Sequence, residues 1–526
     1  MSRWRWLALG VLGILTAGSM AVFVRVPGYM DAEYYYATAV QLSDGHGFQE
    51  PFLWNYLDDP ASLPHPSHLY WMPMASVVAA AGLKTLGSGF RSAQLPFAIL
   101  GAGLPALTAW VALHLKATPR QSFLSGLLAA FPGFYLPFLV TTDAFAAFAW
   151  IGTLAFVSAA AAFRGRGWFW WLVAGLAAGA AHLARADGIL ILFPLGVMAA
   201  LSPRRRFMAI VLLAAGYAMV IAPWMARNLA LSGSLLAAGG ARTLWLTSYD
   251  ELFTYPPTLL NPARWASEGW AAILAARAEA LGSNLTTLAV VVGSVVLGPF
   301  MLVGAWHKRR EPLVVGGAAY LFLLLAVMTL AFPFSGSRGG LFHSAAGVLP
   351  ILWALAPIGL DRVLEWVSDR RKWDPERAWR LFAPLILAVV IGISVWVAWD
   401  RVIAGWPSAP RWEASDSQHR AVSDALLLLD ASPGVVAVND PPGFHLASGL
   451  PCIVMPFGDP STLRRVTDRF NVEWVILDAN YPAPLAGVYQ DPESVPWLAL
   501  RGQMDDSQGR PVYLLQVISQ SAGGTP

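Results

Sequence analysis

Long apolar segments recur along the first 400 residues of the chain and predict transmembrane helices. Each runs for about 17–22 residues, and about 20 residues at a rise of 1.5 Å per residue span the hydrocarbon core of a bilayer. The predicted spans lie near residues 6–24, 95–115, 121–140, 144–163, 168–183, 187–201, 206–224, 285–305, 312–332, 343–360 and 381–399. The pattern therefore predicts a polytopic α-helical membrane protein with about eleven transmembrane helices.

Basic residues collect in every second loop between these segments. They are Arg3 and Arg5, Lys116 and Arg120, Arg164 and Arg166, Arg204 to Arg206, Lys308 to Arg310, and Arg370 to Lys372. Because Lys and Arg are retained on the cytoplasmic side of a membrane, these loops and the N-terminus are predicted to be cytoplasmic. The first large loop (25–94), the second (225–284) and all residues after Asp400 then face outward from the cytoplasmic (inner) membrane.

Two apolar segments admit another interpretation. Residues 1–24 resemble a signal peptide, but the apolar run has span length and ends in Arg25-Val26-Pro27, so an uncleaved first helix is favoured. Residues 69–86 form a short candidate span with aromatic residues at the start and Lys84 near the end. A crossing there would break the alternation of basic loops, so this segment is predicted to lie on the outer membrane surface.

The composition of the chain changes after residue 400 to that of a soluble domain. Apolar runs at 435–438, 452–455, 474–477 and 512–517 alternate with helix-like segments, a pattern typical of an α/β domain with a largely parallel sheet. The chain is thus divided into a transmembrane domain, 1–400, and an extracytoplasmic α/β domain, 401–526. A turn at 439–443 follows one predicted strand, but no G-x-G-x-x-G or P-loop pattern accompanies it, so a nucleotide site is not predicted.

Composition excludes several classes of function. Hydrophobic residues make up 56% of the chain and charged residues 13%, and the mean hydropathy is +0.53, which is too apolar for a soluble enzyme. The net charge of +3 without a long basic stripe does not indicate a nucleic-acid partner. The single Cys452 excludes an intramolecular disulfide and a cysteine-based zinc site.

Acidic residues directly follow the first apolar segment. Asp31 and Glu33 open a predicted helix that continues through Tyr34 to Ser43. Helix capping and the helix dipole explain two carboxylates at this place without any function. Their position favours a functional interpretation, because carboxylates at the membrane surface can meet a substrate carried by a lipid.

Further charged residues are predicted at the same outer level. Asp143 is either a helix cap or a second functional acid, and Arg185 with Asp187 forms either a structural salt bridge or part of a site. Arg227 also faces outward. Arg338 lies in the Gly-rich turn 335–340, where backbone N–H groups and a guanidinium suit phosphate oxygens, although a plain helix–helix turn explains it equally well.

The first outer loop also holds candidate metal ligands. His65, His68 and Asp58 offer the nitrogen and oxygen atoms that divalent cations bind. Pro64 and Pro66 make this segment extended, so the spacing does not place both imidazoles on one ion. No cofactor is therefore predicted with certainty, and a divalent cation stays open.

Several short motifs, in a fixed order, resemble a known superfold. They are Asp31-Ala-Glu33-Tyr34-Tyr35, Pro66-Ser-His-Leu-Tyr70-Trp71, Phe90-Arg91-Ser-Ala-Gln-Leu-Pro96, Thr142-Asp143-Ala144, Arg185-Ala-Asp187-Gly188 and Ala222-Pro223-Trp224-Met-Ala-Arg227-Asn228. Together they resemble the GT-C superfold of membrane glycosyltransferases. The likeness is to the bacterial branch similar to protein O-mannosyltransferases and lipid A aminoarabinose transferases, and it extends over most of residues 1–360.

The resemblance implies an inverting enzyme that moves a hexosyl or pentosyl group from a polyprenyl-phosphate donor to a lipid, polysaccharide or protein acceptor. The family's loop acid maps to Asp31, as general base on the acceptor hydroxyl. Family members often have two adjacent acids, whereas Ala32 separates them here, so Glu33 stays open as the base.

The resemblance assigns the remaining candidates to substrate binding. Asp143 would orient the substrate or share the base role, and Arg227 or Arg338 would neutralise the leaving phosphate. Arg185, Asp187, Tyr34 and His65 complete the predicted substrate site, and the C-terminal domain is a candidate holder of the acceptor.

A transporter or flippase for a lipid-linked glycan is the alternative function. Such a protein would show internal repeats and broken helices with charges near the middle of the membrane. The charges here collect at one face, beside a long outer loop, which favours the enzyme. An inactive homologue whose outer domain only binds is a third possibility.

Overall fold

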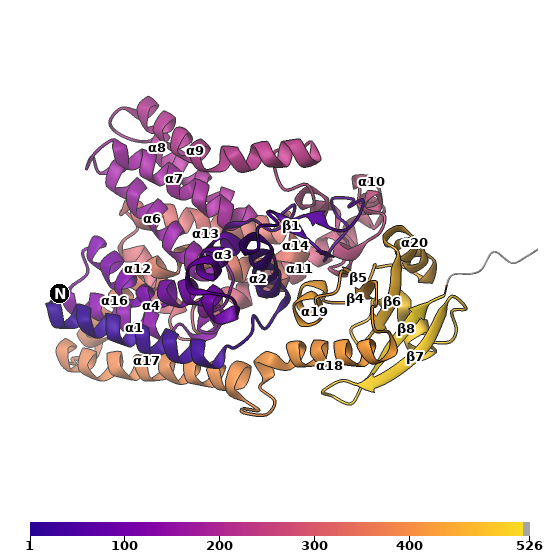
Figure 1. Cartoon of the computed structure of the whole chain (residues 1–526). Helices are drawn as coiled ribbons and strands as arrows, with labels where there is room; N and C mark the ends of the chain where they lie inside the picture. The colour runs from indigo at the N-terminus through magenta and orange to yellow at the C-terminus, as the bar shows by residue number, and fades with distance from the viewer. Residues whose placement is uncertain (519–526) are drawn as a thin grey trace, which may run out of the picture.

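The chain forms a bundle of long helices with an α/β region at its C-terminal end (Figure 1). The computed structural model describes residues 1–518. The helices of the bundle and its loops are α1 Arg3–Phe23, α2 Met30–Ser43, α3 Met74–Leu86, α4 Phe90–His114, α5 Pro119–Ala130, α6 Phe145–Phe163, α7 Phe169–Ala184, α8 Leu192–Ala200, α9 Arg206–Ser232, α10 Pro262–Ser267, α11 Gly269–Thr286, α12 Gly298–His307, α13 Pro312–Leu330, α14 Pro333–Ser335, α15 Leu341–Ala345, α16 Leu349–Arg371 and α17 Pro375–Ala398.

Short helical turns connect many of these helices. They are η1 Gly133–Tyr135, η2 Phe138–Val140, η3 Ala186–Ile191, η4 Gly240–Trp245, η5 Asp250–Phe253, η6 Pro257–Leu259, η7 Thr287–Val292, η8 Gly336–Gly340, η9 Ala346–Val348 and η10 Trp399–Ile403. Three of them, η7, η8 and η10, are π-helical. Single π-helical turns are often found at functional sites.

Seven helices in the described part of the chain are long and apolar enough to cross a membrane, and eight if the bent pair 119–140 is one span. The polytopic helical class predicted from the sequence is confirmed. Four of the eleven predicted segments are not single long helices. Residues 121–140 belong to the bent pair. Residues 169–184 and 186–200 form shorter apolar helices, and 285–305 is divided between η7 and α12.

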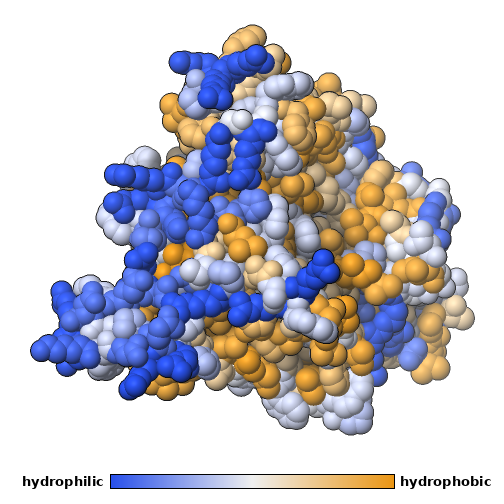
Figure 2. Space-filling view, turned by 90° about the vertical axis from the view of Figure 1, so that its left-hand side faces the viewer, coloured by the Kyte–Doolittle hydropathy of each residue, from blue (hydrophilic) through white to orange (hydrophobic). Residues whose placement is uncertain are grey.

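Basic loops gather at the end of the bundle that carries the N-terminus. Figure 2 looks onto this end, where patches of hydrophilic residues interrupt a largely hydrophobic surface. Large apolar side chains on the flanks are exposed, among them Leu302 and Phe322 at 74% and 75%. Such a surface suits contact with lipid, because exposing large apolar side chains to water costs free energy.

The C-terminal region contains a six-stranded sheet flanked by helices. Its helices are η11 Arg411–Glu413, α18 Ala414–Leu429, α19 Pro441–Ser448, α20 Pro460–Phe470, η12 Ala483–Leu485 and α21 Ala486–Gln490. The strand order is β2-β5-β4-β6-β8-β7, with β4 Val435–Val438, β5 Cys452–Val454, β6 Val472–Leu477, β7 Leu498–Asp505 and β8 Pro511–Val517. Strands β2, β5, β4 and β6 are parallel to one another. Strand β8 runs antiparallel to β6, and β7 runs antiparallel to β8.

One strand of this sheet comes from the first large loop. Strand β2, Phe52–Leu53, pairs in parallel with β5, with Phe52 opposite Cys452 and Leu53 opposite Ile453. The same loop forms a separate two-stranded sheet from β1 Gln49–Glu50 and β3 His65–Pro66. The α/β sheet therefore draws on both predicted domains, and the boundary at residue 400 stays a prediction.

Further contacts join the C-terminal region to the start of the chain. Arg25 forms a two-pronged ion pair with Glu413, with N–O distances of 2.6 and 2.7 Å. The Trp412 indole donates a hydrogen bond to the Val26 carbonyl at 2.9 Å. Helix α19 packs against α2, which places the C-terminal domain beside the helix that carries Asp31 (Figure 1).

The segment predicted to lie on the membrane surface forms helix α3. It has 13 residues, about 20 Å of helix, which is too short to cross the hydrocarbon core. It packs between α2 and α4 and carries no acidic residue in its first turn. Its length agrees with the predicted interfacial placement.

Candidate active site

A cavity of about 520 Å³ lies where α2 meets the bundle and the second large loop. Its polar wall comes from residues far apart in the sequence. They are Asp31, Arg185, Asp187, Arg338, His343, Tyr70 and Tyr249. The rest of the lining is largely apolar and includes Ile189, Leu190, Ile221, Leu235, Leu236, Val327 and Met328. A cavity lined by both charged and apolar side chains suits an amphipathic ligand.

Asp31 and Glu33 face different surroundings although both belong to the first turn of α2. The N-cap of this helix is Tyr29, and within the described chain it makes no side-chain capping bond. The carboxylate of Asp31 lines the cavity and keeps 30% of its surface exposed to it. Glu33 is only 2% exposed and lies against Asp440 at the start of α19.

Asp143 is held in the loop before α6. Its Oδ1 accepts the Ala144 N–H at 2.5 Å, and its Oδ2 accepts the Tyr29 hydroxyl at 2.6 Å. The side chain is 1% exposed. The N-cap residue of α6 is Ala144, so Asp143 bonds a single N–H at the helix start rather than forming the predicted cap.

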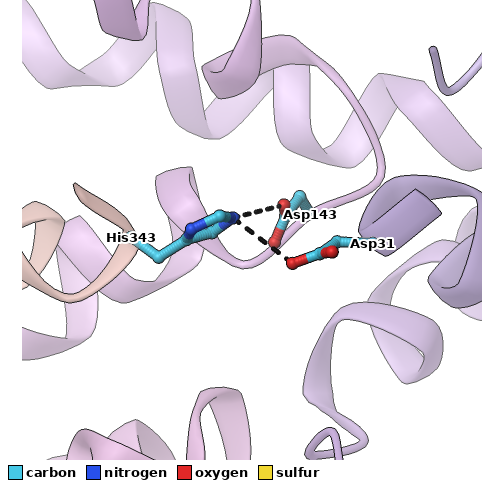
Figure 3. Close-up of side chains that lie close together, drawn as sticks. All are labelled: Asp31, Asp143 and His343. Carbon is cyan, nitrogen blue, oxygen red and sulfur yellow. Dashed lines mark hydrogen bonds and ion pairs between the residues drawn. The ribbon is translucent and has the colours of Figure 1, made fainter. Parts of the chain in front are cut away.

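His343 completes a cluster with the two aspartates, as Figure 3 shows. Its Nε2 lies 3.2 Å from Asp143 Oδ2 and 3.6 Å from Asp31 Oδ2. Its Nδ1 is 2.9 Å from the Gly339 carbonyl, which can only accept, so Nδ1 carries a proton. The ring also stacks on Phe145, with centroids 4.2 Å apart. Nε2 therefore points between two carboxylates.

Burial and neighbouring charge separate the two aspartates. Removal from water raises the pKa of Asp31 to about 6, against the opposing effect of His343. Burial also acts to raise the pKa of Asp143. There the charge and hydrogen bond of His343, the Tyr29 hydroxyl and the Ala144 N–H outweigh it and hold that pKa below its usual value. Asp31 is consequently the better proton acceptor near neutral pH.

Two arginines reach the cavity from different elements. Arg185, at the break between α7 and η3, contacts both carboxylate oxygens of Asp187, at 3.0 and 3.1 Å. Ser344, next to His343, donates to Asp187 and accepts from Arg185. Arg338 lies in the π-helical turn η8, with its guanidinium 4.8 Å from the centre of the Tyr249 ring.

Other residues predicted for the site lie outside the cavity lining within residues 1–518. Tyr34 is 1% exposed, and its hydroxyl accepts the His68 N–H, while its neighbour Tyr35 lines the cavity. Arg227 packs between Phe48 and Trp224 and donates to the Ser67 carbonyl at 2.8 Å. It braces the first loop, and substrate contacts for Tyr34 and Arg227 stay predictions.

The predicted metal ligands of the first loop are split. His65 Nε2 lies 2.8 Å from Asp58 and its Nδ1 lies 3.4 Å from Glu50, in a buried group outside the cavity lining of the described chain. Burial lowers the pKa of His68 to about 3, and its Nδ1 lies 3.2 Å from the Trp71 carbonyl. His65 and His68 thus have separate hydrogen-bonding partners.

Among the described residues, one group of side chains lies close enough together to bind a metal ion: Asp31, Asp143 and His343. Two carboxylate oxygens and one imidazole nitrogen could hold a divalent cation or share a proton. His343 was not identified as a site residue from the sequence, because it falls at the edge of an apolar segment. A histidine next to a Gly-rich turn at membrane depth is itself a functional signal.

Comparison with known proteins supports the fold. Residues 64–227 match a protein family described as dolichyl-phosphate-mannose-protein mannosyltransferase. Curated protein sequences gave no match. The family match includes α3, Asp143, Arg185 and Asp187 but not Asp31 or His343.

Solved structures match nearly the whole chain at low sequence identity. ArnT from Cupriavidus metallidurans bound to undecaprenyl phosphate is 13% identical with a TM-score of 0.60, covering 100% of both chains. The apo form of that protein is 12% identical with a TM-score of 0.55, covering 96% of this chain and 97% of the other. The Archaeoglobus fulgidus oligosaccharyltransferase is 14% identical with a TM-score of 0.50, covering 99% and 75%. This chain has the fold of the GT-C membrane glycosyltransferases.

Proposed function

We propose that this protein is an inverting glycosyltransferase that takes a sugar from a polyprenyl-phosphate donor. The observation that carries the proposal is a cavity lined by Asp31 and His343 together with many apolar side chains, with Asp143 buried behind His343. A polyprenyl-phosphate sugar has matching parts, because its lipid is apolar and its phosphate and sugar are polar. The match to ArnT bound to undecaprenyl phosphate supports a donor of this class.

The reaction requires one base and one stabilised leaving group. The Asp31 carboxylate accepts the proton of an acceptor hydroxyl while that oxygen forms a bond to C1 of the sugar. The bond between C1 and the phosphate oxygen breaks on the opposite side, and its electron pair leaves with the polyprenyl phosphate. His343 lies beside Asp31 and favours its ionised form, and Asp143 holds His343 in place.

The arginines of the cavity supply positive charge for the leaving phosphate. Arg338 has no acidic partner among the ion pairs of residues 1–518, so its full charge can act on a phosphate. Arg185 is already paired with Asp187 and is better suited to orienting the sugar. We therefore assign phosphate binding to Arg338.

We propose that the site faces outward from the cytoplasmic membrane, because the basic loops are expected on the cytoplasmic side. The acceptor there is a lipid, a polysaccharide or a protein that presents a hydroxyl group. Transfer at that face makes the protein a cell-envelope enzyme, with its C-terminal domain on the same side as the cavity.

Substitution at position 31 tests the proposal. Asp31→Asn keeps the size of the side chain but removes the base, so we expect turnover in proteoliposomes to fall by about 10²–10⁴-fold. The assay uses polyprenyl-phosphate sugars from the native membrane and follows release of polyprenyl phosphate. The apparent Tm of the variant should stay near that of the wild type.

Glu33→Gln and Asp424→Asn are the matched controls. Asp424 is exposed on α18, so its variant should turn over normally. Normal turnover by Asp31→Asn together with loss by Glu33→Gln would move the base to Glu33. Movement of the donor across the bilayer without cleavage of its phosphate bond would instead identify a flippase.

A further inference from the structure

A second, strongly polar pocket lies between α2 and the C-terminal sheet. Its volume is about 330 Å³, near the lower end of the range of about 300–1,000 Å³ for small-molecule sites. It opens at the carboxyl ends of β4 and β6, where Asn439, Asp440 and Asp478 follow the strands. Ligands of open α/β sheets bind at this edge, because the loops after parallel strands meet there.

The lining of this pocket combines hydrogen-bond donors and acceptors. Gln418 and His419 reach it from α18, and Asn480 and Ser507 from loops. Two of its charged groups are already engaged. Asp478 accepts Asn439 Nδ2 at 2.5 Å and the Asn480 N–H at 2.8 Å, and Asp506 pairs with Arg510 at 2.7 Å.

Two polar atoms beside this pocket lack partners within residues 1–518. They are Nδ1 of His419 and Oε2 of the buried Glu33. Both lie 2.9 Å from the point where a Cβ on Gly443 would sit, so they converge on the start of α19. A buried polar atom without a partner costs free energy, and His419, which lines the pocket, is one of the two residues that carry such an atom.

The polar pocket adjoins the catalytic cavity through the first turn of α2. Met30 lines the polar pocket, and the next residue, Asp31, lines the catalytic cavity. Asp440 at the pocket wall is close enough for its charge to act on Asp31. The polar pocket therefore lies next to the helix turn that carries the proposed base.

We propose that this pocket binds the hydroxyl groups of a neutral carbohydrate acceptor. The proposal rests on the proposed glycosyltransferase function and adds the class of its second substrate. Carboxylates and amides that alternate around a pocket suit neighbouring sugar hydroxyls, since each hydroxyl both donates and accepts a hydrogen bond. With Asp506 paired to Arg510, the remaining charge of Asp440 and Asp478 disfavours an anionic ligand.

Binding of simple glycosides to the full-length protein in detergent tests this proposal. Saturation-transfer NMR compares methyl α-D-mannopyranoside and methyl α-L-arabinofuranoside with methyl glucuronide, which carries a carboxylate. We expect a signal at millimolar concentration from at least one neutral glycoside, and a signal about tenfold weaker from the glucuronide.

A double variant, Gln418→Ala with His419→Ala, removes two lining groups from α18. Alanine favours the helix, and His419 Nδ1 has no partner within the described residues, so the fold should be kept. The glycoside signal should fall about tenfold in this variant. Asn480→Ala provides a second, independent variant from a loop, and Asp424→Asn on α18 should bind as the wild type does.

Three results would overturn the proposal. They are no signal from either neutral glycoside with the wild type, an unchanged signal in both pocket variants, and a signal that appears only with added Mg²⁺ or Ca²⁺. The test needs no turnover, so it is separate from the proposed function. Glycoside binding at this pocket with normal turnover by Asp31→Asn would contradict the base assignment and leave the sugar site in place.

Discussion

Asp31 and Glu33 show how two residues of one short motif are separated by helix geometry. An α-helix turns by about 100° per residue, so residues two apart point to nearly opposite sides. Asp31 thereby faces the cavity, and Glu33 faces α19 of the C-terminal domain. The geometry favours Asp31 as the base, a choice that the sequence left open.

We predict that the loss of kcat/KM at acidic pH reflects protonation of Asp31. Its pKa is raised to about 6 by burial, and a general base must be ionised. We therefore expect kcat/KM to fall about tenfold per pH unit below pH 6 and to be level above it. Initial rates of polyprenyl-phosphate release, measured from pH 4.5 to 8, provide the test.

His343→Gln checks which group produces this acidic limb of the pH profile. The imidazole of His343 favours the ionised form of Asp31, so its removal should move the limb to higher pH as well as lower the rate. Thr258→Ala on the second loop is a control whose limb should not move. A limb unchanged in His343→Gln would mean that another group titrates.

At the scale of the element, close helix packing depends on small residues. In α16, a Cβ on Gly359 would lie 1.8 Å from the Phe300 carbonyl oxygen, and one on Gly304 would lie 2.2 Å from the Leu355 carbonyl oxygen. Helices α12 and α16 therefore touch backbone to backbone. Small residues at membrane helix interfaces permit such an approach.

Gly359→Ala is expected to destabilise the bundle by about 1–3 kcal/mol, because the added methyl group forces two rigid backbones apart. The apparent Tm in detergent should fall, and turnover at low temperature should persist because the cavity is formed elsewhere. Gly392→Ala in α17 is the matched control, with open space around the added Cβ. Equal apparent Tm values for the two variants would contradict the close packing of α12 against α16.

Other elements differ in how well the sequence predicted them. The strands β4, β5, β6 and β8 follow runs of apolar residues and were expected. Strand β7 was missed because its outer positions are polar and its side chains are largely exposed. Strand β2 has only two residues and is stabilised by pairing with β5, a partner 400 positions away. A strand of this kind cannot be predicted from the local sequence pattern.

At the scale of the whole molecule, orientation in the membrane follows from the basic loops. We expect a cysteine placed at Arg166 to be cytoplasmic and one placed at Asp424 to face outward. Both positions are exposed. A membrane-impermeant maleimide added to intact spheroplasts should therefore label Asp424→Cys and spare Arg166→Cys.

The native cysteine is not expected to interfere with this labelling test. Cys452 is fully buried and its thiol contacts the Pro441 carbonyl, so the unmodified protein should stay unlabelled. Both variants should react once the membrane is permeabilised. Labelling of Arg166→Cys alone in intact spheroplasts would invert the orientation and place the cavity in the cytoplasm.

The sequence by itself determined the class of the molecule. Apolar segments of span length and alternate basic loops depend on the bilayer, which imposes its thickness and charge asymmetry on any chain. Arg185 and Asp187 could be singled out because charges near membrane depth are costly without a function. Asp31, Asp143 and Arg338 could be singled out by their predicted place at the outer face.

Only the tertiary structure decided which of these residues meet. It joined His343 to two aspartates more than 100 positions away, turned Glu33 toward the C-terminal domain, and used Arg227 to brace a loop. The physical reason is that hydrophobic and charge patterns specify which side of an element is buried. The packing of distant elements, through specific side-chain shapes and hydrogen bonds, then decides which polar groups share a cavity.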